Sequence, residues 1–89
     1  MLVKTVTVQN QLGIHARPAA LLTKTANLFE CAIRIKKGTK CADAKSILAV
    51  MTLGAKHNDV LRLEFEGINE IAACDAITAL FDSRFGEED

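Results

Sequence analysis

The strongest constraint on the fold is the strand predicted over residues 60–66, in which apolar and charged side chains alternate strictly from Leu61 onward. The apolar residues are Leu61, Leu63 and Phe65, and the residues between them are Arg62, Glu64 and Glu66. A period of two is typical of a β-strand with one face in the core and the other in water. Residues 31–36 repeat the pattern, with inward Cys31, Ile33 and Ile35. The chain therefore predicts a sheet that is wet on one face and covered on the other.

Helical patterns alternate with these strands. An apolar spacing of three and four residues predicts one helix over 16–28, whose buried face carries Ala19, Leu22, Ala26 and Phe29. Another is predicted from 70 to about 85, with Asn69 as its N-cap and residues 86–89 beyond it as a loose acidic tail. Further strands are predicted at 2–8 and 40–43 and a short helix at 47–53. The expected order is strand, helix, strand, strand, helix, strand, helix.

Composition places the chain among small globular proteins. Its 89 residues predict one domain spanning positions 1–89. Lys+Arg and Asp+Glu are equal at 11 each, so no basic surface favours nucleic acid as a partner. No apolar run approaches the ~18 residues of a spanning helix, and residues 1–8 do not resemble a secretory signal, so we expect no membrane insertion and a cytoplasmic location.

The remaining chemistry-bearing residues predict no cofactor and no metal site. Cys31, Cys41 and Cys74 are widely spaced, without a metal-binding or disulfide pattern, and are expected to be buried reduced thiols. No cluster of His, Cys and carboxylate residues has ligand spacing, and no glycine-rich nucleotide loop is present. His57, between Lys56 and Asn58, is expected to be a solvated turn residue.

A histidine precedes the first helix. Pro18 places the helix start at Ala16 or Arg17, because proline is tolerated in a first turn, where its missing N–H has no helical partner. His15 is therefore expected at or next to the N-cap, facing the unpaired first-turn N–H groups and the positive end of the helix dipole. Such a place suits a histidine that accepts a phosphoryl group, with Arg17 to bind the anionic oxygens. Gly13 is expected to leave room for a partner's backbone.

Ser46 is a strong N-cap candidate for the short helix at 47–53, which Gly54 would end. This helix is apolar nearly all round, so it cannot bury every side chain from two turns. We expect Val50 and Leu53 in the core, and a docking patch formed by the outward residues Ile47, Leu48 and Met51. A wholly buried helix is the alternative.

Residues 13–20 (GIHARPAA), 44–48 (AKSIL) and 51–55 (MTLGA) together resemble the HPr family. These proteins are histidine-containing phosphocarriers of the bacterial phosphoenolpyruvate-dependent sugar phosphotransferase system. The resemblance implies an α+β open-faced β-sandwich, in which a four-stranded antiparallel sheet carries three helices on one face. It also implies a relay protein rather than an enzyme, acting as a monomer.

For single residues, the resemblance implies that His15 takes a phosphoryl group on Nδ1 from phosphorylated enzyme I and passes it to sugar-specific enzyme IIA domains. Arg17 would contact the phosphate, and Ser46 would be a regulatory site for an HPr kinase/phosphorylase in bacteria that have one. The docking patch would contact the shared partners. Ala16 stands where some relatives carry threonine, so no hydroxyl contact to the phosphate is available there.

Two other functions stay open at this stage. One is a relay with the same chemistry in a nitrogen-regulatory or other non-transport branch. The other is an allosteric regulator or corepressor that works through Ser46 and the docking patch. The intact pair of His15 and Arg17 argues against regulation as the sole role.

Overall fold

The computed structural model describes residues 1–87 of the chain, and within this range four strands form one antiparallel sheet. The strands are β1 (Leu2–Thr7), β2 (Ala32–Lys37), β3 (Lys40–Asp43) and β4 (Val60–Glu66). Their spatial order is β1-β4-β2-β3, so β4 is paired along both edges. Phe65 on β4 faces Leu2 on one side and Ile33 on the other. The strongly alternating segment is thus a central strand.

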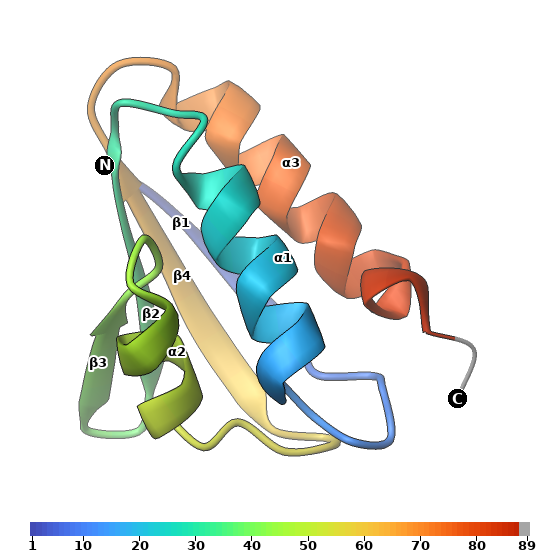
Figure 1. Cartoon of the computed structure of the whole chain (residues 1–89). Helices are drawn as coiled ribbons and strands as arrows, with labels where there is room; N and C mark the ends of the chain where they lie inside the picture. Colours follow the sequence, from blue (N-terminus) through green and yellow to red (C-terminus); the bar gives the residue numbers. More distant parts are fainter. Residues whose placement is uncertain (88–89) are drawn as a thin grey trace.

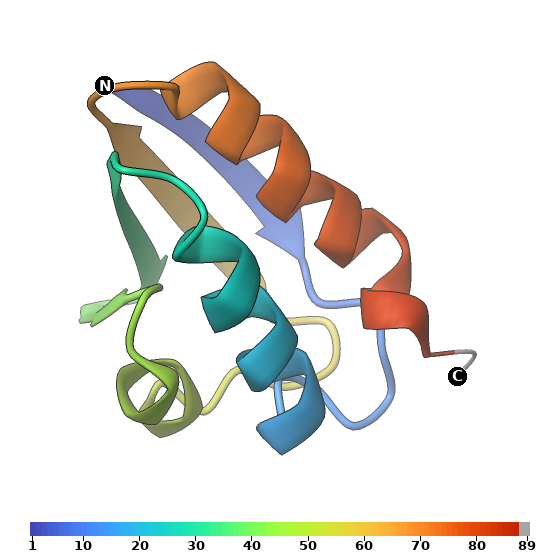
Figure 2. The same ribbon diagram turned by 45° about the horizontal axis from the view of Figure 1, so that its top comes forward.

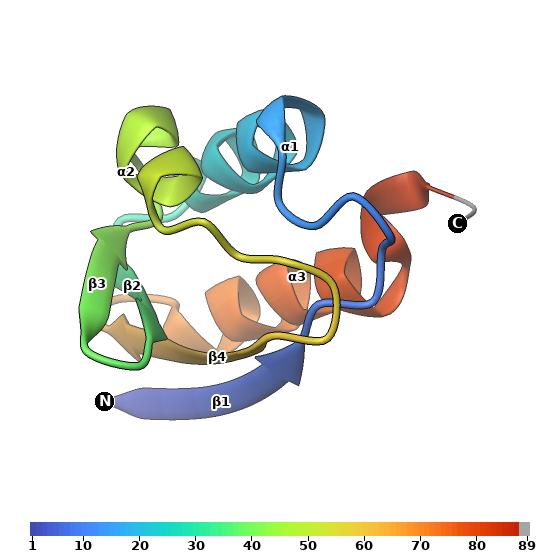
Figure 3. The same ribbon diagram turned by 90° about the horizontal axis from the view of Figure 1, so that it is seen from below.

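Three α-helices cover one face of this sheet in the described part of the chain (Figure 1). They are α1 (Ala16–Ala26), α2 (Ile47–Thr52) and α3 (Glu70–Asp82). Seen from below, the helices lie on one side of the strands, and α1 packs between α2 and α3 (Figure 3). The expected α+β fold and element order are confirmed.

The core lies between the sheet and the helices (Figure 2). Its fully buried side chains include Ile33, Ile35, Leu61, Leu63 and Phe65 from the strands and Leu22, Ile77 and Phe81 from the helices. Each such side chain contributes about 1.5–3 kcal/mol relative to an exposed position. Val50 and Leu53 are buried as predicted, which anchors α2 to this core.

The outer face of the sheet differs from the prediction at Glu64, which is only 4% exposed rather than solvated. Its carboxylate accepts a hydrogen bond of 3.2 Å from Arg34 Nε, and the cationic ends of Lys36 and Arg62 lie within 3.3 Å. Arg34 and Glu64 face each other directly across β2 and β4. The hydrogen bond from Arg34 is the main cause that lowers the pKa of Glu64. Long neighbouring side chains therefore cover a position that alternation alone assigns to water.

Helix ends also differ from the sequence prediction. Helix α1 ends at Ala26, two residues early, and α3 ends at Asp82 rather than near Phe85. Arg84 and Phe85 have φ of +56° and +55°, a left-handed conformation that an α-helix cannot contain, and residues 84–86 form a separate 3-10 turn. Phe85 is nevertheless buried, with its ring packed edge-on against Phe81 at 4.9 Å between centroids.

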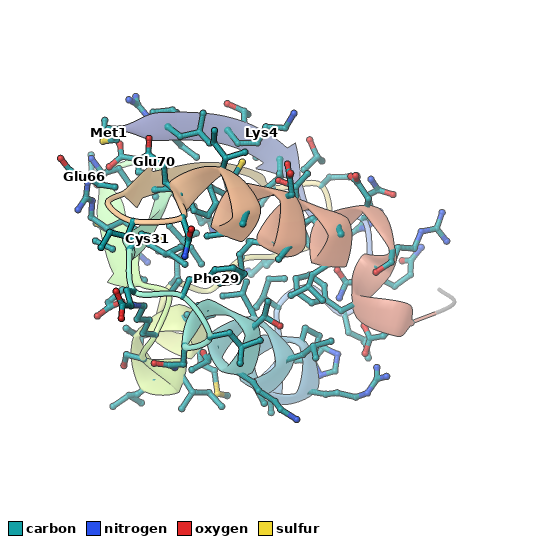
Figure 4. All side chains as sticks on the ribbon, turned by 90° about the horizontal axis from the view of Figure 1, so that it is seen from above. Met1, Lys4, Phe29, Cys31, Glu66 and Glu70 are labelled. Carbon is teal, nitrogen blue, oxygen red and sulfur yellow. The ribbon has the colours of Figure 1, made fainter. Side chains whose placement is uncertain are left out.

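Asn69 is the N-cap residue of α3, as predicted, but its side chain does not satisfy the helix end. Asn69 adopts a left-handed conformation and, among residues 1–87, makes no side-chain cap bond. Instead, the Glu70 carboxylate accepts a hydrogen bond from the Gly67 N–H at 3.1 Å, so it ties the incoming loop to the first turn. The same carboxylate lies 3.9 Å from the amino group of Met1. Figure 4 shows Met1, Glu66 and Glu70 gathered at this end of the molecule.

The cysteines follow the prediction in part. Cys31 and Cys74 are buried free thiols, whereas Cys41 is exposed. Cys41 lies on the edge strand β3 opposite Lys36, whose side chain belongs to the polar outer face. A residue on that face of an edge strand has no helix above it, which explains its exposure.

Candidate functional site

His15 lies at the N-cap of α1, as the position of Pro18 predicts. Its backbone is extended, with φ of −82° and ψ of −168°. Within the described residues its side chain makes no cap hydrogen bond to the helix. Its Nε2 instead lies 2.9 Å from Oε2 of Glu87, and the side chain is 35% exposed. The histidine is thus half-buried and held from outside its own helix.

The loop before His15 is fixed by the chain itself. Gly13 has φ of +68°, and a Cβ there would lie only 2.5 Å from the carbonyl oxygen of Ala55. The next N–H, of Ile14, donates to the same carbonyl at 3.0 Å. Only glycine fits this contact, because it combines a positive φ with close backbone approach. The proposed room for a partner's backbone is therefore wrong: the neighbour of Gly13 is the 55–56 segment of this chain.

Arg17 lies in the first turn of α1 and points its guanidinium at the same carboxylate. Its NH1 donates to Oε2 of Glu87 at 3.2 Å, while the side chain is 61% exposed. The imidazole and the guanidinium therefore converge on one anionic oxygen. This confirms that the sequence brings His15 and Arg17 together at the start of the helix.

Glu87 is the site residue that sequence reasoning missed. Its side chain is only 12% exposed, and its second oxygen accepts a hydrogen bond of 2.9 Å from Nδ2 of the buried Asn10. The left-handed turn at Arg84 and Phe85 carries the chain back toward α1, and the buried Phe85 anchors it. The predicted loose tail is wrong for residues 86 and 87, and its last two residues, 88 and 89, lie outside the described range. A large aromatic residue followed by Gly86 was the one sequence signal of this.

The electrostatic state of Glu87 follows from these contacts. Burial acts to raise its pKa, but hydrogen bonds from Asn10, His15 and Arg17 act the other way and hold the pKa below its ordinary value. The carboxylate is therefore ionised near neutral pH. An ionised carboxylate can only accept hydrogen bonds, so the nitrogen of His15 that faces it must carry a proton.

Ser46 occupies the N-cap of α2, and its Oγ accepts a hydrogen bond from the Ala49 N–H at 3.3 Å. The predicted cap is confirmed. The docking patch is exposed, at 43% for Ile47, 74% for Leu48 and 42% for Met51, which excludes the alternative of a wholly buried helix. Because α1 and α2 pack against each other, the patch and the histidine belong to neighbouring helices (Figure 3).

Comparison with known proteins gives consistent matches over nearly the whole chain. A family model described as the PTS HPr component phosphorylation site matches residues 2–83. The phosphocarrier protein HPr of Treponema pallidum is 46% identical over 99% of this chain and all of its own length. The corresponding protein of Cupriavidus necator is 41% identical over 98% of both chains. A crystal structure of HPr from Thermoanaerobacter tengcongensis superimposes with a TM-score of 0.96 at 42% identity, covering both chains completely. The chain belongs to the HPr family.

Membership in the HPr family makes this protein a phosphocarrier of the phosphotransferase system, not an enzyme. The HPr model ends at residue 83, so Glu87 lies beyond the matched region.

His57 is exposed beside the left-handed Asn58, consistent with a turn residue. In residues 1–87 no group of three or more His, Cys, Asp or Glu side chains is placed to hold a metal ion. Nor is any helix of this range long and apolar enough to cross a bilayer.

Proposed function

We propose that His15 accepts a phosphoryl group from phosphorylated enzyme I and passes it to sugar-specific enzyme IIA domains. The chain would do so as a single cytoplasmic domain over residues 1–89, working as a monomer. Arg17 would bind the oxygens of the transferring group. Family membership and nearly end-to-end similarity to phosphocarriers support this assignment.

The observation that carries the proposal is the shared oxygen of Glu87. One anionic oxygen lies 2.9 Å from the imidazole of His15 and 3.2 Å from the guanidinium of Arg17. The start of α1 therefore holds a histidine at an anion site with a permanent positive charge. Preorganised positive groups of this kind stabilise the charge on a transferring phosphoryl group.

The transfer step needs only one free nitrogen. The lone pair of Nδ1 forms the new N–P bond while the bond between phosphorus and the donor breaks, and the proton on Nε2 stays in place. Passage to an enzyme IIA domain reverses the step at the ring, because the N–P bond breaks and the electron pair returns to Nδ1. No other reactant is required in either direction.

The docking patch supplies the contact with both partners. Ile47, Leu48 and Met51 form an apolar surface on α2, next to the helix that carries His15. An apolar centre with a polar surround is the usual composition of a protein interface. Enzyme I and enzyme IIA domains would use this surface in turn.

Ser46 would act as a switch on that surface, in a host that has an HPr kinase/phosphorylase. Its hydroxyl lies at the N-terminus of α2, where added phosphate is compatible with the helix dipole. The same charge would lie next to Ile47 in the docking patch, where it opposes burial against a partner.

The test is incubation of the protein with phosphoenolpyruvate and enzyme I, followed by assay for an acid-labile phosphate. His15→Ala is expected to lose all labelling while its melting temperature stays within a few degrees of wild type, because a half-exposed cap position contributes little to the core. His57→Ala is the matched control and should label normally. Labelling that persists in His15→Ala would refute the assignment.

A further inference from the structure

The contact between Glu87 and His15 places a fixed carboxylate against one ring nitrogen of the histidine. Glu87 Oε2 lies 2.9 Å from Nε2, and its other oxygen is held by Asn10, so both ends of the carboxylate are fixed. With 12% of its side chain exposed, Glu87 is largely screened from competing water. The acceptor is therefore a built part of the site rather than a chance surface contact.

A fixed acceptor at Nε2 determines which ring nitrogen is nucleophilic. A neutral imidazole carries one proton, on one of its two nitrogens, and the other nitrogen carries the lone pair. Because an ionised carboxylate cannot donate, it favours the form with the proton on Nε2. The lone pair then resides on Nδ1. A histidine without this partner would divide its population between the two forms.

Resting on the proposed phosphoryl transfer to His15, we propose that Glu87 is a positioning residue that selects Nδ1 as the nucleophile and offsets the charge that forms on the ring. When Nδ1 gives its electron pair to phosphorus, Nε2 keeps its proton and the ring gains a formal positive charge. The carboxylate already lies against that N–H. The same division of roles operates in catalytic triads, where a buried carboxylate orients a histidine and stabilises its cationic form.

The carboxylate also acts in the opposite sense, because its charge repels the phosphoryl oxygens. Two features limit this cost. The contact is made through Nε2, so the carboxylate lies on the far ring nitrogen from the new N–P bond. Arg17 also donates to the same oxygen and neutralises part of its charge. The favourable interaction with the ring is direct and charge-assisted, so it prevails.

The experiment compares Glu87→Ala, which removes the acceptor, with Glu87→Gln, which keeps an amide oxygen and removes the charge. Glu30→Gln is the matched control, since Glu30 is an exposed glutamate that follows the opposite end of α1. Two readouts are taken. One is the ¹⁵N chemical shifts of the His15 ring near pH 8, which report where the proton resides. The other is the single-turnover rate of phosphorylation by phosphorylated enzyme I.

In wild type the two ring nitrogens should be well separated, with the proton on Nε2. Glu87→Ala should move both shifts toward their average and slow phosphorylation about five- to tenfold, as expected for loss of one charge-assisted contact at a partly exposed site. Glu87→Gln should keep most of the shift separation and show an intermediate rate. Glu30→Gln should match wild type in both readouts.

If Glu87→Ala kept the ¹⁵N shifts and the phosphorylation rate of wild type, the proposal would be overturned, because the contact would then affect neither the proton position nor the rate. Faster phosphorylation of Glu87→Ala would overturn it as well, because the carboxylate would then be blocking the site. Thermal melts monitored by circular dichroism verify that each variant is folded. Failure of the proposed function is separately visible, since His15→Ala would then still be labelled, whereas the ¹⁵N shifts report on Glu87 in either case.

Discussion

Helices α1 and α2 each begin at an N-cap residue, but the two cap side chains make different contacts. Ser46 turns inward, and its hydroxyl accepts from Ala49 in its own helix. His15 has a similarly extended backbone, but its ring contacts Glu87, 72 positions away in sequence. A serine cap contributes to stability, typically by about 1 kcal/mol. The histidine forgoes that contribution, which leaves its helix end and its ring available for chemistry.

The largest expected effect tests the α1 end. Arg17→Ala should slow phosphoryl transfer about 10- to 100-fold in both directions, because the guanidinium stabilises charge on the transferring group. Its melting temperature should hardly change, since the side chain is 61% exposed. Rates are measured at saturating enzyme I. Lys24→Ala, an exposed cation in the last turn of α1, should leave them intact. An unchanged rate in Arg17→Ala would make it only a docking residue.

A second prediction concerns the docking patch beside the α2 cap. Leu48→Asp should weaken binding to enzyme I roughly tenfold, because a charge replaces an apolar contact at the interface. Leu28→Asp is a close control, as Leu28 is 76% exposed and Leu48 74%. Calorimetric titration measures the affinity. A large loss of thermal stability in Leu48→Asp alone would show that Leu48 supports the fold instead of a partner.

Two substitutions of Ser46 separate its role as a helix cap from its effect on the docking patch. Ser46→Ala should destabilise the protein by about 1 kcal/mol and leave transfer unaffected, because only the cap is lost. Ser46→Asp should retain or slightly raise stability yet slow phosphorylation of His15 severalfold, because its charge opposes burial of the docking patch. Melting temperature and transfer rate are compared for both variants. A rate equal to wild type in Ser46→Asp would place Ser46 outside the docking surface.

The smallest expected effect is a difference in how the stability contributions at the N-termini of α1 and α2 depend on pH. Because the folded-state pKa of Glu87 is depressed, its contribution to stability is present above the ordinary value of 4.5 and is lost as pH falls through the folded-state value. Glu64 and Asp59 also have lowered pKa values and contribute in the same direction. The informative quantity is therefore the stability difference between wild type and Glu87→Gln, measured by urea unfolding. It should shrink on acidification, whereas the difference for Ser46→Ala should stay constant.

Local patterns were sufficient to predict the parts of the structure that depend on neighbours in sequence. Pro18 located the start of α1, and Ser46 located the cap of α2. The alternation in residues 61–66 located the central strand β4. Each prediction rests on contacts within a few residues. The contact between the His15 ring and Glu87 was not predicted, because Glu87 comes from the other end of the chain.

The remaining errors share one physical cause. Glu87 reaches the site only because Arg84 and Phe85 adopt a left-handed conformation that no helical periodicity indicates. Glu64 is buried because cations on β2 and β4 reach over it, which depends on the register between the strands. Both outcomes are set by tertiary geometry, so a pattern along one segment cannot contain them.

The close approach of Gly13 to Ala55 joins the loop before His15 to the segment that follows α2. This contact is made of main chain on both sides, so the spacing between His15 and α2 does not depend on the outward side chains Ile47, Leu48 and Met51. If the docking patch recognises the partners as proposed, its residues could be exchanged to change which acceptor binds without moving the ring of His15. Recognition and chemistry would then be adjustable separately in this small domain.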